Sequence, residues 1–188
     1  MKNKFFRIVD TAHYFLAEKL SQSHNLLDAT AGNGHDTLFL AQNSPVDAVV
    51  WFFDIQQQSI DKTINVLAEA DLAFKGRPVN ACHTKVAEYI DEPLDIAMFN
   101  LGYLPGGSHI LTTKATTSLT AIQAVLEMLA PGGLLSIVAY PGHSEGYIEQ
   151  QQVCEYLRGL PSTKFTSASW KLINQENKPP VLYIVEKK

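Results

Sequence analysis

The sequence predicts an α/β fold, namely a mostly parallel seven-stranded sheet with helices on both faces and a C-terminal antiparallel hairpin. Apolar runs typical of strands alternate with helical patterns through most of the chain, which is the element order that builds a parallel sheet. The runs at 94–100 and 134–140 contain very few polar residues, as expected for parallel strands covered on both faces. Only a short loop separates the last two strand-like runs, so we expect them to pair as a hairpin.

The first half of the chain is expected to hold three strands with helices between them. The opening segment reads as an amphipathic helix rather than a signal peptide, because charges or His interrupt its apolar residues and no small-residue cleavage site follows. Further along, Ile60, Ile64 and Leu67 recur at helical spacing. The expected strands are 24–30, 47–54 and 77–83, and the expected helices are 1–20, 31–42, 56–72 and 85–90.

The second half repeats the pattern and ends in the hairpin. A helix at 116–130 is expected to end at the Pro-Gly-Gly of 131–133, because Gly commonly terminates a helix and Pro cannot continue it. The sequence shows no linker and no internal repeat, so a single domain spanning 1–188 is expected. The remaining expected elements are strands at 94–100, 134–140, 164–174 and 179–188 and a helix at 145–160.

Composition excludes several classes of protein. No apolar run approaches the roughly 20 residues needed to cross a bilayer, so we expect a soluble, cytoplasmic protein without a membrane partner. Cys82 and Cys154 show neither a CxxC motif nor zinc-type spacing with His, which predicts reduced thiols and no metal site. The net charge of −4 argues against sequence-independent clamping of long nucleic acid. Lys2, Lys4 and Arg7 are candidates for local phosphate contact, although a solvated helix face is the simpler interpretation.

A glycine turn follows the first expected strand and reads Asp-Ala-Thr-Ala-Gly-Asn-Gly-His-Asp, residues 28–36. Gly32 and Gly34 let the backbone turn tightly and approach a ligand, and the helix that follows offers free N–H groups and a partial positive charge. Asp54 ends the second strand, where an acidic residue commonly binds ribose hydroxyls. Glycines in such turns also occur for structural reasons alone, and Asp54 has the alternative of an exposed strand end.

The same turn decides between two cofactor classes. A dinucleotide fingerprint needs a third glycine where this chain has Thr37, which argues against an NAD-dependent oxidoreductase. The pattern DxxxGxG with an acidic end to the second strand is instead what S-adenosylmethionine (SAM) enzymes of the Rossmann-like class use. Asp28 and the turn are then expected to receive the methionine end of SAM, and Asp54 the ribose. His35 and Asp36 have an alternative as helix-capping residues, since a carboxylate in the first turn favours the helix dipole.

The segment Asn-Leu-Gly-Tyr, 100–103, follows the expected strand at 94–100. If that strand is the fourth, Asn100 lies beside the glycine turn at the carboxyl edge of the sheet. Amine-methylating SAM enzymes often carry Asn or Asp, two residues and then an aromatic at this place, usually with prolines that this chain lacks. Asn100 would orient the amine and Tyr103 would pack on the substrate, so positioning and exclusion of water supply much of the acceleration. The alternative is a glycine-rich surface turn with Tyr103 packed for structure.

Later strand ends supply further candidates. His143 follows the strand at 134–140 and is expected to line the pocket, with a purely structural His as the alternative. The expected hairpin tip is rich in side-chain amides that could reach a nucleoside, although such tips are usually only solvated. These tip residues are Asn174, Gln175 and Asn177.

The motifs together resemble one family along nearly the whole chain. The chain carries, in that family's order and spacing, DATAGNGHDTLFLA, FDIQ, MFNLGYLPGG, a Thr-Thr helix start at 116–117, YPGH and INQENKPP. This is similar to the small bacterial family of rRNA methylases, whose characterised activity, of the MnmM or YtqB type, is methylation of tRNA 5-aminomethyl-2-thiouridine. The resemblance implies a Rossmann-like class I SAM-dependent methyltransferase. Its substrate would be the wobble uridine of the tRNA anticodon arm, and its product 5-methylaminomethyl-2-thiouridine.

The resemblance and the site chemistry assign residues to both ligands. Beside the cofactor we expect Asp28, Gly32, Asn33, Gly34, Asp36, Asp54, Ile55, His83 and Asn100. Beside the substrate we expect Gly102, Tyr103, Leu104, His143, Asn174, Gln175 and Asn177, with Asn100 and Tyr103 as the catalytic pair. The family commonly has Asp-Ser-His after strand three, whereas this chain has Ala81, Cys82 and His83. An acid that often holds the adenine amine is therefore missing.

Other activities stay open from the sequence. The acidic net charge also suits a methyltransferase acting on small-molecule amines, and rRNA is a second nucleic-acid substrate. A non-catalytic nucleic-acid-binding module of the same fold is a further alternative. A homodimer is compatible with each of them.

Overall fold

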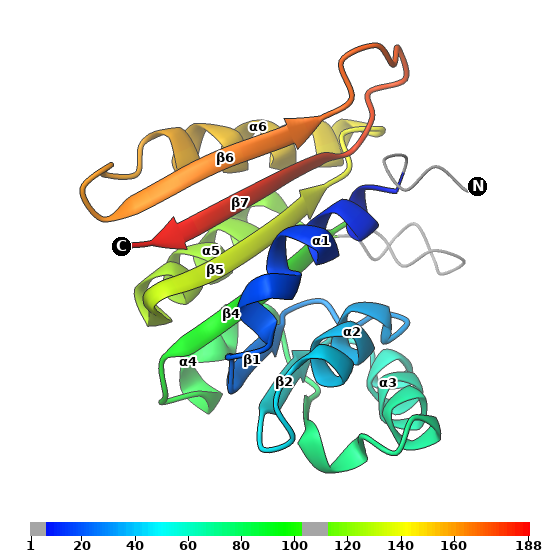
Figure 1. Ribbon diagram of the computed structural model, residues 1–188. Coiled ribbons are helices and arrows are strands. Elements are labelled where there is room, and N and C mark those ends of the chain that lie inside the picture. The colour runs from blue at the N-terminus through cyan, green and yellow to red at the C-terminus, as the bar shows by residue number, and fades with distance from the viewer. Residues whose placement is uncertain (1–6, 103–112) are drawn as a thin grey trace.

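The computed structural model describes residues 7–102 and 113–188, which contain a seven-stranded sheet (Figure 1). Its strands are β1 Asn25–Asp28, β2 Val49–Phe53, β3 Gly76–Val79, β4 Leu94–Leu101, β5 Leu129–Ala139, β6 Phe165–Lys171 and β7 Val181–Lys187. Their order is β3-β2-β1-β4-β5-β7-β6, with β7 antiparallel to both neighbours and the other pairs parallel. The expected mostly parallel sheet with a C-terminal antiparallel hairpin is confirmed.

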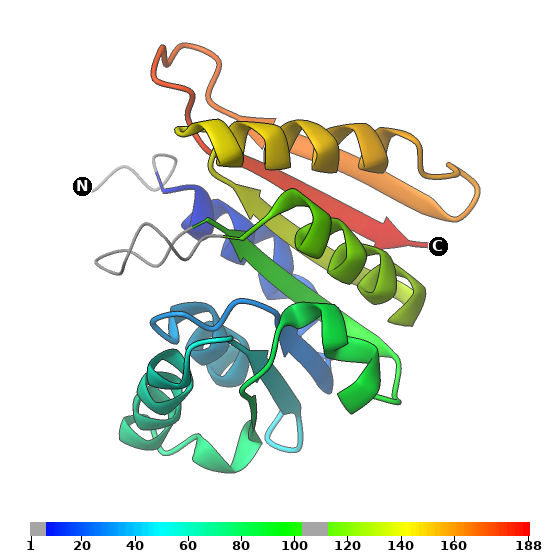
Figure 2. The ribbon, with the colours of Figure 1, turned by 180° about the vertical axis from the view of Figure 1, so that it is seen from behind.

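Helices cover both faces of the sheet. The face turned to the viewer in Figure 1 carries α1 Ile8–Leu20, α2 His35–Asn43 and α3 Gln57–Glu69. The opposite face, seen in Figure 2, carries α4 Val86–Tyr89, α5 Ala115–Met128 and α6 Ser144–Arg158. Each face of the sheet has its own cluster of buried apolar side chains. Strand β4 contributes to both clusters, because successive strand residues point to opposite sides of the sheet. It gives Ile96 and Met98 to the first cluster and Ala97 and Phe99 to the second.

The helix end expected at the Pro-Gly-Gly of 131–133 is wrong. Helix α5 ends at Met128, and residues 131–133 lie within β5. The pairing of β4 with β5 is irregular next to residues 131–133. Its register shifts there, between Leu94 and Ile96 of β4. A Cβ on Gly133 would lie 2.9 Å from the carbonyl oxygen of Leu94, so glycine is needed for the strands to approach. The glycine therefore serves the sheet and not the end of the helix.

The third strand is shorter than expected. It ends at Val79, because the N–H of Ala81 turns back to donate to the Val79 carbonyl oxygen at 3.0 Å. Short 3-10 turns precede and follow the strand, at Ala73–Lys75 and His83–Lys85. His83 is consequently presented from a turn above the end of the sheet, and not from a strand.

The topological switch point lies between β1 and β4. The chain builds the sheet outward from β1 through β2 to β3, then crosses to the other side of β1 to place β4 and β5. Open α/β sheets bind ligands at such a reversal, beyond the carboxyl ends of the strands. Here the N–H of Ala29 donates to the Met98 carbonyl oxygen at 2.9 Å, and the N–H of Asn100 donates to Thr30 Oγ1 at 2.8 Å. The glycine turn and the end of β4 are therefore in direct contact.

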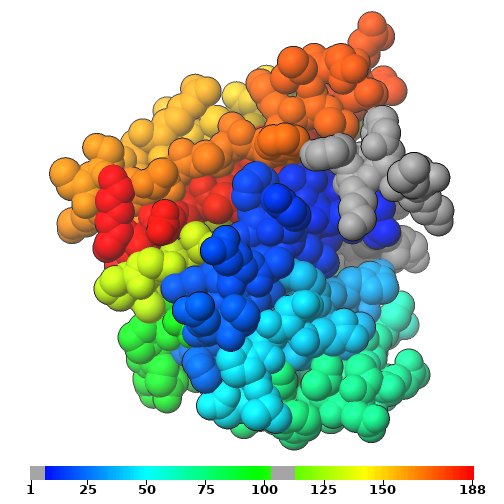
Figure 3. All heavy atoms as spheres, viewed as in Figure 1, coloured from blue at the N-terminus to red at the C-terminus, as the bar shows by residue number. Residues whose placement is uncertain are grey.

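Helix α1 occupies the middle of one face. Figure 3 shows its side chains, in blue, between the cyan atoms of α2 and α3 and the orange atoms of the hairpin. Its inner side buries Leu16 and Leu20. On its outer side Phe15 meets Trp170 of β6 edge to face, with 6.3 Å between ring centroids. This packing also carries His13 of α1 to the start of α2.

Candidate active site

Asp28 organises the turn between β1 and α2 from inside the protein. Its side chain is fully buried. Oδ1 accepts a hydrogen bond from the N–H of Thr30 at 3.0 Å, and Oδ2 accepts one from the Thr37 hydroxyl at 2.6 Å. Burial, and next the negative charge of Asp36, raise the pKa of Asp28 to about 7, against the lowering effect of both hydrogen bonds. Asp28 thus shapes the turn, and its expected contact with the methionine end of SAM stays a prediction.

The raised pKa of Asp28 makes stability depend on pH. In the unfolded chain this carboxyl has its ordinary pKa of 3.8, so the fold favours its protonated form up to about pH 7. Its stabilising contribution is therefore complete below pH 4, and the free energy of unfolding falls by up to about 4 kcal/mol as pH rises to about 7. Urea unfolding of wild type and Asp28→Asn between about pH 4.5 and 7.5 measures this effect. The free energy of unfolding of the variant should rise relative to that of wild type as pH rises. A difference between the two that is the same at every pH contradicts the prediction.

Asp54 closes the turn from the end of β2. Its Oδ2 accepts a hydrogen bond from the N–H of Gly32 at 3.0 Å, and its Oδ1 accepts one from the N–H of Gln56 at 2.8 Å. Gly32 has a left-handed φ of 51°, which glycine adopts readily. A carboxylate offers about four lone-pair sites, so Asp54 keeps acceptor capacity for two ribose hydroxyls. Ile55 follows it with 58% of its surface exposed, and its expected contact with SAM stays a prediction. These residues fit the nucleoside half of SAM.

Gly34 precedes α2 with a left-handed φ of 81°, and the packing of α3 requires it to be glycine. A Cβ there would lie 3.1 Å from both Cα and Oγ1 of Thr63. We expect Gly34→Ala to lower the free energy of unfolding by about 2 kcal/mol, from backbone strain and crowding together. The matched control is Gly142→Ala, whose Cβ would meet nothing within 4 Å. Denaturant unfolding that shows equal stability for both variants contradicts this packing role.

Asn100 is held at the end of β4 by side chains from other elements. Its Nδ2 donates to Oδ2 of Asp36 in α2 at 3.4 Å, and its side chain shares a hydrogen bond with the hydroxyl of Tyr140, which follows β5. The second carboxylate oxygen of Asp36, Oδ1, lies 2.7 Å from Nε2 of His13 in α1. Four segments distant in sequence therefore meet in one cluster, made of His13, Asp36, Asn100 and Tyr140.

Asp36 is the negative centre of this cluster. Its surface is 7% exposed, so water screens its charge weakly. Burial first and the Asp36 charge second raise the pKa of Tyr140, although Asn100 and Arg7 lower it. Tyr140 is therefore a neutral phenol near pH 7 and not a base. The ring of His13 stacks on Phe39 with 3.7 Å between centroids and 3° between planes, which fixes the direction of its nitrogens.

His13 and Tyr140 are functional candidates that the sequence motifs did not identify. A signal existed for Tyr140, which stands directly before the Pro-Gly-His segment, at the carboxyl end of a strand beside β4. No signal existed for His13. It lies on a helix that precedes the first strand, and the burial of Leu16 and Leu20 decides which side of that helix meets α2.

Gly102 directly follows the last residue of β4. Gly102 has a φ of 152°, and a Cβ on it would lie 3.5 Å from the ring of Tyr140. Its carbonyl oxygen accepts a hydrogen bond from the N–H of Thr113 at 3.3 Å, and the Thr113 hydroxyl donates to Oε2 of buried Glu149 at 2.9 Å. Gly102 and Thr113 are thus joined to each other, and Thr113 is anchored on α6. Two of the expected substrate contacts, Tyr103 and Leu104, lie outside the described residues.

Two further residues expected beside the cofactor, Asn33 and His83, contact other parts of the protein. Asn33 accepts a hydrogen bond at Oδ1 from Nζ of Lys62 in α3 at 2.7 Å. His83 is buried, with its ring edge-on to Phe99 at 5.8 Å between centroids, and burial lowers the pKa of this imidazole. Its side chain also hydrogen-bonds the backbone of Ala29. The structure therefore gives Asn33 and His83 structural partners, and their contacts with SAM stay predictions.

His143 caps helix α6. Its Nδ1 accepts a hydrogen bond from the N–H of Gly146 at 3.1 Å, and this capping is the structural alternative for the residue. Its contact with the substrate stays a prediction. The amides of the hairpin connection are all exposed to solvent, namely those of Asn174, Gln175 and Asn177.

Two absences concern only the described part of the chain. Residues 7–102 and 113–188 contain no group of three or more His, Cys, Asp or Glu side chains that could hold a metal ion. Within the same two ranges, none of the helices is both long and apolar enough to traverse a membrane. The thiols of Cys82 and Cys154 are both free and half-buried.

Comparison with known proteins identifies relatives along the whole chain. The family model described as "Putative rRNA methylase" matches residues 50–186. The crystal structure of a "putative rRNA-methylase" from Clostridium thermocellum matches with a TM-score of 0.94 and 34% identity, over 100% of this chain and 99% of that one. A "putative methyltransferase" from Streptococcus mutans, solved in complex with SAH, gives a TM-score of 0.87 and 35% identity, over 97% and 98% of the two chains.

A curated relative adds an activity. The chloroplastic tRNA (mnm(5)s(2)U34)-methyltransferase of Arabidopsis thaliana is 32% identical over 191 residues, which cover 96% of this chain and 70% of that protein. The structural relatives confirm the Rossmann-like methyltransferase fold, and the one solved with SAH supports SAM as the cofactor. The placement of SAM at the glycine turn and Asp54 stays a prediction. This chain belongs to the rRNA methylase family of SAM-dependent methyltransferases.

Proposed function

We propose that this chain methylates the aminomethyl nitrogen of 5-aminomethyl-2-thiouridine at the wobble position of tRNA, giving 5-methylaminomethyl-2-thiouridine. Its relatives, the rRNA methylase family and the plant tRNA methyltransferase, support an RNA substrate, and we propose the anticodon arm as the part that binds. The observation that carries the proposal is Asn100, whose side-chain amide stands at the switch point between Asp36 and Tyr140. Bound SAM supplies an electrophilic methyl group.

Asp36 fixes the orientation of the Asn100 amide. A carboxylate only accepts hydrogen bonds, so the NH₂ group of Asn100 faces Asp36 and its Oδ1 becomes the acceptor of the side chain. An amide oxygen that accepts an N–H bond from an amine also directs the lone pair of that amine. Because the amide is held before the substrate arrives, little orientational entropy is lost in the reactive complex.

The charge of the site suits cationic ligands. Asp36 adds its negative charge to the surroundings of Asp28, and Asp54 does so to a smaller extent. A sulfonium and an alkylammonium both carry positive charge, so a weakly screened carboxylate favours the binding of each. The same negative charges would repel an anionic substrate group.

Proton loss from the amine requires an acceptor. An alkylammonium has a pKa near that of Lys, about 10.4, and its nitrogen cannot attack while protonated. We assign the proton to the Asp36–His13 pair, because Asp36 Oδ2 lies beside Asn100 while Oδ1 is bonded to His13. The His13 side chain is 21% exposed, so the pair has contact with solvent to which the proton can pass.

The proposal is tested with tRNA from cells that lack the protein. Incubation with the purified chain and SAM, followed by mass spectrometry of the nucleosides, should convert 5-aminomethyl-2-thiouridine to its methylated form. Parallel reactions contain rRNA or small primary amines in place of tRNA. Methylation of either with an unchanged wobble nucleoside contradicts the tRNA substrate. RNA binding without SAM binding in calorimetry contradicts the enzymatic role.

A further inference from the structure

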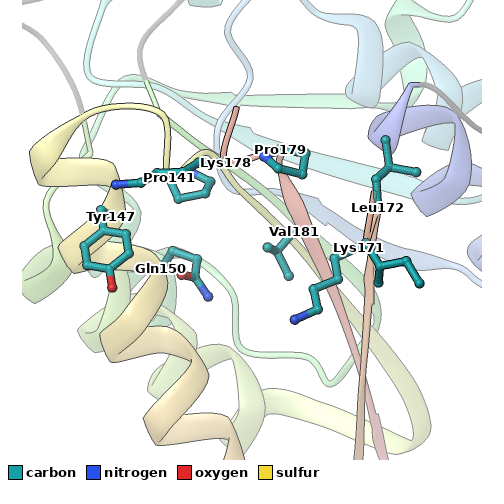
Figure 4. A pocket seen from close by; sticks show the side chains of 9 residues that line it. Pro141, Tyr147, Gln150, Lys171, Leu172, Lys178, Pro179 and Val181 are labelled. Carbon is teal, nitrogen blue, oxygen red and sulfur yellow. The ribbon is translucent and has the colours of Figure 1, made fainter. Parts of the chain in front are cut away.

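A hollow opens at the same edge of the sheet as the candidate active site, between the start of α6 and the β6–β7 hairpin (Figure 4). Its volume is about 320 Å³. Tyr147 and Gln150 line it from α6, and Lys171 and Val181 line it from the two hairpin strands. In Figure 4 the Lys171 side chain extends from β6 toward the space between these elements. The hollow therefore combines an aromatic ring, an ammonium group, a side-chain amide and the apolar side chain of Val181.

Tyr147 and two lysines give the hollow its chemistry. The Tyr147 side chain, 44% exposed, has Nζ of Lys178 over its ring at 4.6 Å from the centroid. Lys171 and Lys178 are both exposed, and within the described ranges neither of them forms an ion pair. The buried Gln150 is fixed as the floor, since its Nε2 donates to the Tyr183 hydroxyl at 2.5 Å. Two ammonium groups without a carboxylate partner leave this region open to an anion.

The hollow adjoins the candidate active site. Its wall residue Pro141 directly follows Tyr140, which shares a hydrogen bond with Asn100. Its floor residue Val181 pairs with Ala139 of β5 on one side and with Lys171 of β6 on the other. One strand, β5, therefore separates the hollow from β4, whose end carries Asn100. A polymer substrate bound at Asn100 would run past this opening.

We propose that this hollow binds a nucleotide of the RNA substrate that neighbours the methylated one. The inference rests on the proposed function and adds a subsite to it. Protein modules that bind single-stranded RNA stack bases on aromatic rings and pair the backbone phosphates with cations. Tyr147 supplies the ring here, while Lys171 and Lys178 supply the cations. In a chain of net charge −4, two ammonium groups that form no ion pair within residues 7–102 and 113–188 favour a phosphate-bearing ligand over an apolar peptide.

The test separates RNA binding from chemistry. A fluorescently labelled anticodon stem-loop RNA and full-length tRNA are titrated against wild type, Tyr147→Ala and the double variant Lys171→Ala/Lys178→Ala. Tyr147→Ala should raise Kd and KM for tRNA about 10-fold, with kcat at saturating tRNA and Kd for SAM unchanged. The double lysine variant should weaken binding and also reduce the slope of log K against log salt by about 1.5.

Matched controls use side chains of the same kind outside the hollow. Phe74→Ala removes an aromatic ring that is 58% exposed, and Lys164→Ala removes an exposed cation at the start of the hairpin. Both should bind tRNA like wild type. If Tyr147→Ala and the double lysine variant also bind within about twofold of wild type, the subsite is refuted even when methylation is normal. If binding depends on the hollow but the aminomethyl group is never methylated, the proposed function fails and the subsite stands.

Discussion

Replacement of Asn100 by alanine should lower kcat for tRNA methylation by roughly 10²- to 10³-fold. The variant loses the amide that we propose orients the amine, and Asp36 and Tyr140 lose the partner that lies between them. The Kd for SAM should stay within about twofold, because the expected SAM contacts lie mainly at Asp54 and the glycine turn, which hydrogen-bond each other without Asn100. Stopped assays at saturating SAM and tRNA measure kcat, and calorimetry measures the binding of SAM.

The conservative variant Asn100→Asp sharpens this test. It keeps an acceptor oxygen of similar size but places a second carboxylate beside Asp36, which is only 7% exposed. Activity should stay well below that of wild type, because the like charges repel and the NH₂ group that faces Asp36 is gone. Weakened SAM binding together with normal chemistry at saturation would show instead that Asn100 acts on the cofactor.

The parallel part of the fold is predictable because each strand carries its own signal. Strand β4 is apolar at successive positions, since Ala97 and Phe99 face one cluster while Ile96 and Met98 face the other. The boundary at 131–133 is not predictable from the same local signal. A glycine that ends a helix and a glycine that lets two strands approach look alike in sequence. At Gly133 the close carbonyl oxygens of Ala130 and Leu94 distinguish the two cases, and they are seen only in the folded chain.

The site is predictable to the extent that strand ends carry it. Asp28, Asp54 and Asn100 each follow or end a strand, and the order of the strands brings their edges together. Their orientations are not encoded locally. Asp28 turns inward, where its Oδ2 accepts a hydrogen bond from the Thr37 hydroxyl, whereas Asp54 is only half-buried. Contacts across distant elements, such as that of His13 with α2, depend on helix packing and leave no motif.

Asp36→Asn should reduce kcat about 100-fold near neutral pH, because the variant removes both the negative centre of the cluster and the proposed proton acceptor. The loss should shrink as pH rises toward 10, since more of the amine is then already deprotonated and needs no acceptor. The ratio of wild-type kcat to variant kcat is measured at several pH values from about 7 to 10. A loss that is the same at every pH contradicts proton acceptance and leaves Asp36 as a residue that positions Asn100.

The free energy of unfolding shows whether a loss of kcat in Asp36→Asn comes from the site or from misfolding. The charge of Asp36 is the second cause of the raised Asp28 pKa, so Asp36→Asn should lower that pKa and leave the fold at least as stable near pH 7. His13→Phe is the companion variant, because phenylalanine keeps the stack on Phe39 while removing the nitrogen bonded to Asp36. It should lose about 10-fold in kcat with the same trend against pH. Wild-type rates in His13→Phe would mean that the proton leaves Asp36 without His13.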